Sequence, residues 1–91
     1  MKDIDDWRSE IDAIDARLVE LLNDRARCVI EIGKLKAAAG LPVQAPSREA
    51  EVIARWRRLA AKGPLDGDAI ERLYRAVLAE AYVVEEQQLT R

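Results

Sequence analysis

Residues 18–36, LVELLNDRARCVIEIGKLK, decide the fold, because their apolar positions recur every three or four residues as on one face of an α-helix. This apolar stripe starts near the N-terminus and is interrupted once, at Arg25. A guanidinium on such a face is costly to bury unless an anion meets it. The stripe consists of Ile4, Trp7, Ile11, Ile14, Leu18, Leu21, Cys28, Ile32 and Leu35.

Arg25 has a second cation on its own face of the helix. Lys36 follows it by eleven residues, which is about three full turns, so the two side chains point the same way. Gly33 lies between them and has no side chain to fill the gap. Two cations directed into one seam indicate that an anion binds there.

The long first helix is predicted to run from about Asp3 or Asp5 to about Ala39. Acidic residues at its start suit the helix dipole, and Gly40 is a natural C-cap. The helix would span roughly 50 Å, which is too long for a compact monomer of this size. Because its stripe keeps close to a coiled-coil period, we expect it to pack against a partner helix.

Two further helices are expected after the loop that contains Pro42. One begins with Ser47 as its N-cap and runs to about Ala61, and the next begins with Asp66 as its N-cap and runs to about Gln88. We therefore expect an all-α fold in one domain, residues 1–91, with a long, a short and a medium helix. The predicted inward residues are Val52, Ile53, Trp56 and Leu59, then Ile70, Leu73, Tyr74, Val77, Leu78, Ala81 and Val84.

The composition excludes several kinds of partner. The net charge of −2 argues against nucleic acid. The chain has no histidine, and its single cysteine, Cys28, fits a small core residue. We therefore expect no metal and no cofactor. No apolar segment has the length of a membrane span, and the N-terminus MKDIDD does not resemble a signal peptide, so we expect a cytoplasmic protein without membrane partners.

Four charged positions besides Arg25 and Lys36 interrupt the amphipathic pattern. Arg48 and Glu49 fall in the first turn of the second helix, and Glu85 falls on the apolar face of the third. Arg8 lies about 100° and about 25 Å from Arg25 on one straight helix, so both can serve one site only if Arg8 comes from a second subunit. Each charge taken singly could instead form a surface ion pair. Together they suit a small dianion.

The chain resembles the all-helical class of chorismate mutases over nearly its whole length. The resemblance is carried by WRSEIDAID, LLNDR, IGKLK and PVQAPSRE, and GPLDGDAIERLYR makes it closest to the mutase domain often fused to prephenate dehydratase. It implies an intertwined helical homodimer with two equivalent sites. It also implies the conversion of chorismate to prephenate in phenylalanine and tyrosine biosynthesis. That pericyclic rearrangement needs no cofactor.

The resemblance assigns roles to three cations of the first helix. Arg8 would reach into the partner's site, and Arg25 would bind a carboxylate of chorismate. Lys36 would donate to the ether oxygen and to a carboxylate. Holding the enolpyruvyl arm over the ring and stabilising the charge on the breaking ether oxygen would lower the barrier.

The resemblance also covers four positions in the second and third helices and one, Ala45, in the loop before the second helix. Arg48 and Glu49 match the Arg-Glu pair whose glutamate accepts from the substrate hydroxyl. Glu85 would lie beside the ether oxygen, to which it can donate only when protonated. Ala45 stands where the family usually has Asp, and Ala81 stands where many members have a small hydroxyl residue. Both count as substrate-binding positions at which binding would be weaker.

Two other functions remain open on the sequence. The piece APSR resembles the loop of isochorismate-pyruvate lyases, which share this fold, whereas GPLD and Glu85 favour the mutase. The chain could also be a non-catalytic helical module for dimerisation or regulation, because a fold does not fix a function.

Overall fold

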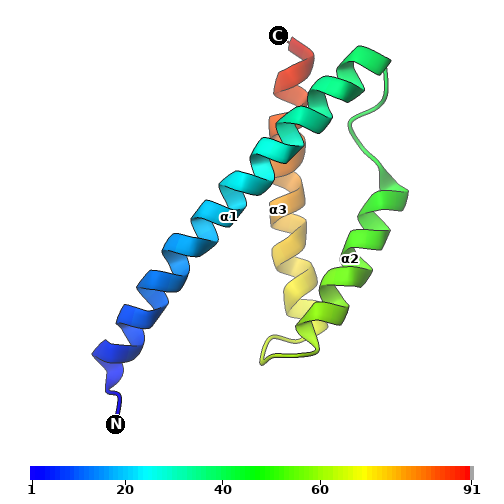
Figure 1. Ribbon diagram of the computed structural model, residues 1–91. Coiled ribbons are helices and arrows are strands. Elements are labelled where there is room, and N and C mark those ends of the chain that lie inside the picture. Colours follow the sequence, from blue (N-terminus) through cyan, green and yellow to red (C-terminus); the bar gives the residue numbers. More distant parts are fainter. Residues whose placement is uncertain (91) are drawn as a thin grey trace.

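The computed structural model describes residues 1–90, and within them it contains three α-helices, one 3₁₀ turn and no strand (Figure 1). Helix α1 spans Ile4–Ala39, α2 spans Pro46–Ala60, α3 spans Gly67–Gln87, and η1 spans Gln88–Thr90. The all-α prediction of one long, one short and one medium helix is confirmed. None of these helices combines the length and the apolar character that a membrane crossing requires.

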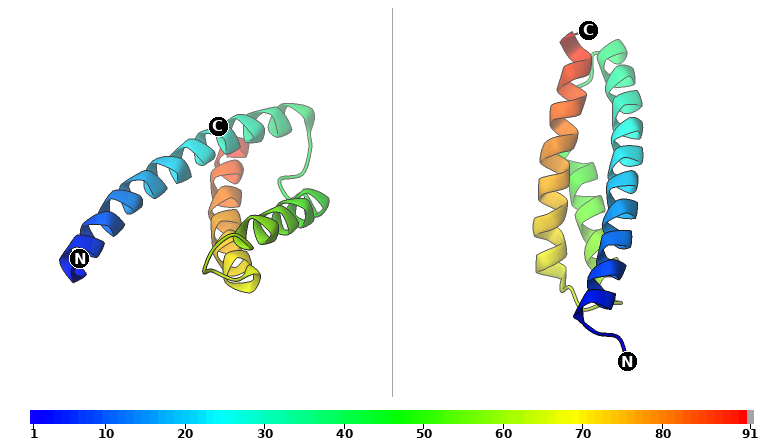
Figure 2. Two further views of the ribbon diagram at one scale, coloured as in Figure 1. Left: turned by 60° about the horizontal axis from the view of Figure 1, so that its bottom comes forward. Right: turned by 90° about the vertical axis from the view of Figure 1, so that its left-hand side faces the viewer.

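Helices α2 and α3 form an antiparallel pair, and the C-terminal half of α1 crosses α3 (Figure 1). The N-terminal half of α1 projects away from both, as Figure 1 and the left view of Figure 2 show. The chain is therefore elongated, with principal extents of 57 × 26 × 14 Å. α3 is the central element, because it packs against both of the other helices.

Local signals place both ends of α1. Asp3 is the N-cap and accepts from the backbone N–H of Asp6 at 2.9 Å, while the Asp6 carboxylate accepts from the Asp3 N–H at 3.0 Å. This capping box satisfies two donors that the first turn leaves free. Gly40 ends the helix with a φ of 67°, a conformation that glycine adopts without strain. Both predicted ends are confirmed.

The predicted start of the second helix is wrong by two residues. The N-cap is Ala45 rather than Ser47, and Pro46 occupies the first helical position. Proline suits that position because its φ is already helical and its missing N–H would have no partner there. Asp66 is the N-cap of α3 as predicted and accepts from the Ala69 N–H at 2.8 Å.

The core of the single chain is thin. Its buried apolar residues are Val29, Val52 and Tyr74. The centre of the Tyr74 ring lies 4.8 Å from the centre of the Trp56 ring. The prediction that Leu59 and Leu73 point inward is wrong for the isolated chain, where they are 55% and 53% exposed. The reason is geometric, because two helices in antiparallel contact cover only a narrow strip of each other.

The apolar stripe of α1 is largely uncovered. Trp7, Ile11, Ile14 and Leu18 are each more than half exposed, and the Lys2 ammonium lies over the Trp7 ring, 4.5 Å from its centre. Cys28 is exposed as well, so the prediction of a core cysteine does not hold for the isolated chain. A contiguous apolar strip of this length marks an interaction surface.

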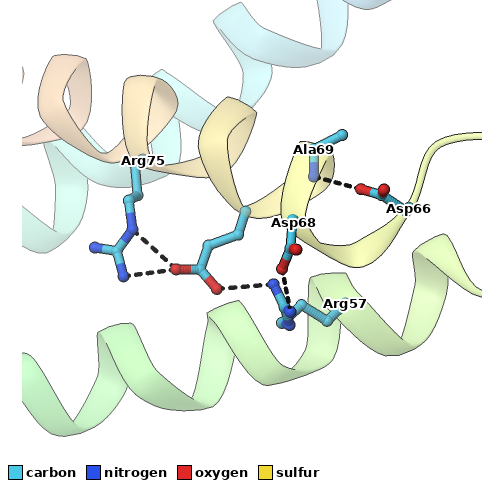
Figure 3. Close-up of polar contacts among 6 residues, drawn as sticks. Arg57, Asp66, Asp68, Ala69 and Arg75 are labelled. Carbon is cyan, nitrogen blue, oxygen red and sulfur yellow. Dashed lines mark hydrogen bonds and ion pairs between the residues drawn. The ribbon is translucent and has the colours of Figure 1, made fainter.

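A partly exposed polar network joins α2 to the start of α3 (Figure 3). Arg57 donates to Asp68 at 2.6 Å and to Glu71 at 3.0 Å, and Glu71 also accepts from Arg75. The hydrogen bond with Arg57 lowers the pKa of Asp68, and the same bond raises the pKa of Arg57. Because solvent still reaches all of these groups, the network fixes the register of the two helices more than it stabilises them.

Gly33 permits the closest approach between α1 and the end of α3. A Cβ atom at this position would lie 3.0 Å from Cγ of Gln88 and 3.3 Å from Cα of Glu85. Real Cβ atoms rarely come so close to their neighbours, so a side chain at position 33 would force Gln88 and the end of α3 to shift by a few tenths of an ångström. This approach brings Glu85 to Lys36.

We predict that Gly33→Ala destabilises the fold by about 1 kcal/mol, because crowding between the helices outweighs the higher helix propensity of alanine. Urea unfolding measures the change. Gly63→Ala is the matched control, since nothing lies within 4 Å of the added Cβ, and it should not destabilise the chain. Equal stability of Gly33→Ala and the wild type would contradict the close approach.

Candidate active site

A cavity of about 220 Å³ lies where the three helices meet. Seven of the eight predicted site residues line it, and they come from all three helices and from the connection before α2. The apolar part of the wall includes Val29, Val52 and Leu78. The seven residues are Arg25, Lys36, Ala45, Arg48, Glu49, Ala81 and Glu85.

Lys36 and Glu85 form the most buried ion pair of this cavity. The Lys36 Nζ lies 2.9 Å from Oε2 of Glu85, and the two side chains are 19% and 8% exposed. The ammonium also donates to the carbonyl oxygen of Val43 at 2.7 Å. Two of its three protons are thus used within the chain, and the third can bind a ligand.

Arg25 carries the positive charge that the apolar stripe does not explain. Its guanidinium carbon lies 5.7 Å from the centre of the Tyr74 ring, so a cation–π contact supports the half-buried side chain. Among the described residues, no carboxylate forms an ion pair with it. The charge therefore remains available in the cavity wall, where an anionic ligand can neutralise it.

The first turn of α2 contributes one cation and one anion. Arg48 is exposed at the rim and lies 3.2 Å from the Glu51 carboxylate. Glu49 is half-buried, and its Oε1 accepts from the hydroxyl of Tyr82 at 2.6 Å. The two side chains of the Arg-Glu pair thus have different environments, one surrounded by solvent and one held by α3.

Tyr82 lines the same cavity but was not predicted as a site residue. Burial raises its pKa to about 12, and the hydrogen bond to Glu49 acts in the same direction. The available signal was its spacing, because Tyr82 lies three residues before Glu85 and so shares its face of α3. A tyrosine on an apolar face is ordinary, and spacing alone does not separate this role from packing.

Arg8 does not line the cavity. It lies on the projecting end of α1, its side chain is 73% exposed, and its guanidinium lies 3.6 Å from the Asp5 carboxylate. This location agrees with the expected helix geometry. Arg8 and Arg25 lie about 25 Å apart along one straight helix and about 100° apart around it, so they cannot serve one site of the same chain.

A second and more apolar hollow of about 370 Å³ lies between α1 and α3. We call it the α1–α3 groove. Its wall includes Leu22, Ala26, Val77 and Val84, and it shares Arg25 with the cavity. Apart from Arg25 it has no cation, so it suits an apolar side chain better than a small anion.

The comparisons with known proteins give one consistent family. The sequence model described as chorismate mutase type II matches residues 7–86. The T-protein of Haemophilus influenzae is 38% identical over 87 residues, which cover 96% of this chain and 23% of that protein. The bifunctional chorismate mutase/prephenate dehydratase of Neisseria gonorrhoeae is 42% identical over 78 residues, covering 86% and 21%.

A solved structure agrees with these relatives. The chorismate mutase (form II) of Thermus thermophilus aligns with a TM-score of 0.85 and 34% identity, covering 93% of this chain and 96% of that one. This chain therefore spans less than a quarter of the two curated relatives and nearly all of the Thermus protein.

Proposed function

This chain belongs to the type II chorismate mutase family, and from that premise we propose that it converts chorismate to prephenate. The cavity at the junction of the three helices carries the proposal, because it gathers seven residues that the family resemblance singled out. We further propose that residues 1–91 form one mutase domain that works in the cytoplasm on the route to phenylalanine and tyrosine.

The rearrangement requires the protein to position chorismate and to stabilise the charge on its ether oxygen, and it requires no nucleophile. Arg25 and Arg48 bind the carboxylates of chorismate and hold the enolpyruvyl arm over the ring. Lys36 directs its free proton to the ether oxygen, whose negative charge grows as the carbon–oxygen bond breaks. The ammonium is already fixed by Val43 and Glu85, so little reorganisation accompanies this charge development.

Glu85 has a role that depends on its proton. As the acid it donates a second hydrogen bond to the ether oxygen, and as the carboxylate it repels the charge that develops there. The close approach at Gly33 places its Cα against α1. The side chain then has little freedom to leave the site.

We propose that the active form is a homodimer in which the α1 helices pair across a two-fold axis. The uncovered stripe of α1 and the α1–α3 groove offer complementary apolar surfaces for this pairing. Burying them supplies the core that the single chain lacks. Arg8 of the partner subunit then completes each cavity.

We predict that the purified chain forms prephenate from chorismate and that Lys36→Ala lowers kcat about a hundredfold or more, because an electrostatic donor is lost. Arg25→Ala should mainly weaken substrate binding. The reaction is followed by loss of chorismate absorbance.

Matched controls come from the same helix. Lys34→Ala and Arg27→Ala remove exposed cations that pair with Glu31 and Asp24, and both variants should keep their activity. Salicylate formed from isochorismate would identify a lyase instead. Wild-type chain that acts on neither substrate would identify a non-catalytic module.

We predict that mixing two inactive variants restores activity through subunit exchange. Arg8→Ala and Lys36→Ala each spoil both sites of their own homodimer. A mixed dimer has one intact site, so an equal mixture should reach about a quarter of wild-type activity after exchange. Sedimentation equilibrium measures the dimer separately. A fully active monomer would contradict the shared site.

We predict that activity depends on a hydrogen-bond donor at position 85 beside the ether oxygen. Glu85→Gln keeps a permanent donor of the same shape and should retain activity near neutrality. Glu85→Ala removes the donor and should lose activity. Glu86→Gln is the matched control on the exposed neighbour and should keep wild-type activity. Full activity in Glu85→Ala would remove Glu85 from the mechanism.

A further inference from the structure

One hydrogen bond in the cavity ties α3 to the first turn of α2. The Tyr82 hydroxyl donates to Oε1 of Glu49 at 2.6 Å, across 33 positions of sequence. Both side chains are half-buried, and both line the cavity. The N-cap of α2, Ala45, makes no side-chain hydrogen bond. Tyr82 is thus a link between the two helices at a point where α2 does not cap itself.

Tyr82 is a permanent donor in this link. Burial raises its pKa to about 12, the hydrogen bond to Glu49 adds to the increase, and the backbone of Ala45 opposes part of it. The phenol therefore stays protonated at physiological pH, and its proton has an anionic acceptor. The distance of 2.6 Å is in the range of such charge-assisted bonds.

The hydrogen bond gives the two oxygens of the Glu49 carboxylate different roles. A glutamate has several rotatable bonds, and an unheld one loses that freedom when it binds a ligand. Here Oε1 is occupied by Tyr82, while Oε2 has no hydrogen-bond partner among residues 1–90. The carboxylate is thereby fixed with one oxygen ready to accept from a hydroxyl group.

We propose that Tyr82 is a positioning residue for substrate recognition, which orients Glu49 so that its second oxygen accepts from the ring hydroxyl of the substrate. This inference rests on the proposed function. Tyr82 does not touch the reacting atoms, and it acts through Glu49 alone. It therefore improves binding of the substrate and its transition state to the same extent, which changes KM and leaves kcat in place.

The test uses Tyr82→Phe, which removes one hydroxyl and keeps the ring. With chorismate, KM should rise roughly three- to tenfold while kcat stays within about twofold. With a chorismate analogue that lacks the ring hydroxyl, the variant and the wild type should be equal. In a Glu49→Ala background, Tyr82→Phe should cause no further change in KM, because no carboxylate remains to be oriented.

Each outcome separates the possible roles. A wild-type chain inactive on chorismate overturns the proposed function and this inference with it. An active wild type with an unchanged KM in Tyr82→Phe overturns only the positioning role. Equal losses on chorismate and on the analogue show that Tyr82 only shapes the cavity, which also overturns the proposal. The Glu49→Ala background keeps the test valid if the single variant folds poorly, because the unpaired carboxylate is then absent.

Discussion

The ion pair between Lys36 and Glu85 is the interaction on which the candidate site depends. It lies at the crossing of α1 and α3, where Gly33 lets the helices come close. Removing two charges from water is costly, and a buried pair adds little net stability. The pair is better understood as a fixed arrangement of charge that, in the proposed reaction, holds Lys36 in position to donate to the ether oxygen. Its presence in so thin a core favours a functional role.

The thin core and the location of the cavity have one cause. Three helices that cross in a chain of 91 residues cannot enclose a large interior, so the space between them remains open to a ligand. The uncovered stripe on α1 then needs a second chain, and the same helix carries Arg8 on its projecting end. In the proposed dimer, the association of the two chains therefore also completes each site with Arg8.

Most of the fold could be predicted because its signals are local. Asp3, Gly40 and Asp66 each mark a helix end through their own side chain or backbone freedom. The start of α2 was missed because Pro46, which suits the first helical turn, prevails over the capping preference of Ser47. The residues of the candidate site also differ in whether a local sequence signal predicts them. The charge of Arg25 on an apolar stripe is enough to predict an anion site. The bond between Tyr82 and Glu49 could not be predicted, because it depends on the rotation of α3 relative to α2 and not on any spacing along the chain.

Ala45 illustrates how the parts of the site compensate for one another. A side-chain cap at a helix start typically contributes about 1 kcal/mol, and α2 lacks one. An aspartate there would supply the cap, but it would also place a second carboxylate beside Glu49 in a cavity proposed to bind a dianion. The two carboxylates would then repel each other unless the backbone of α2 fully engaged the new one. Tyr82 secures the same turn of α2 with a neutral group, so the helix is held without adding negative charge to the site.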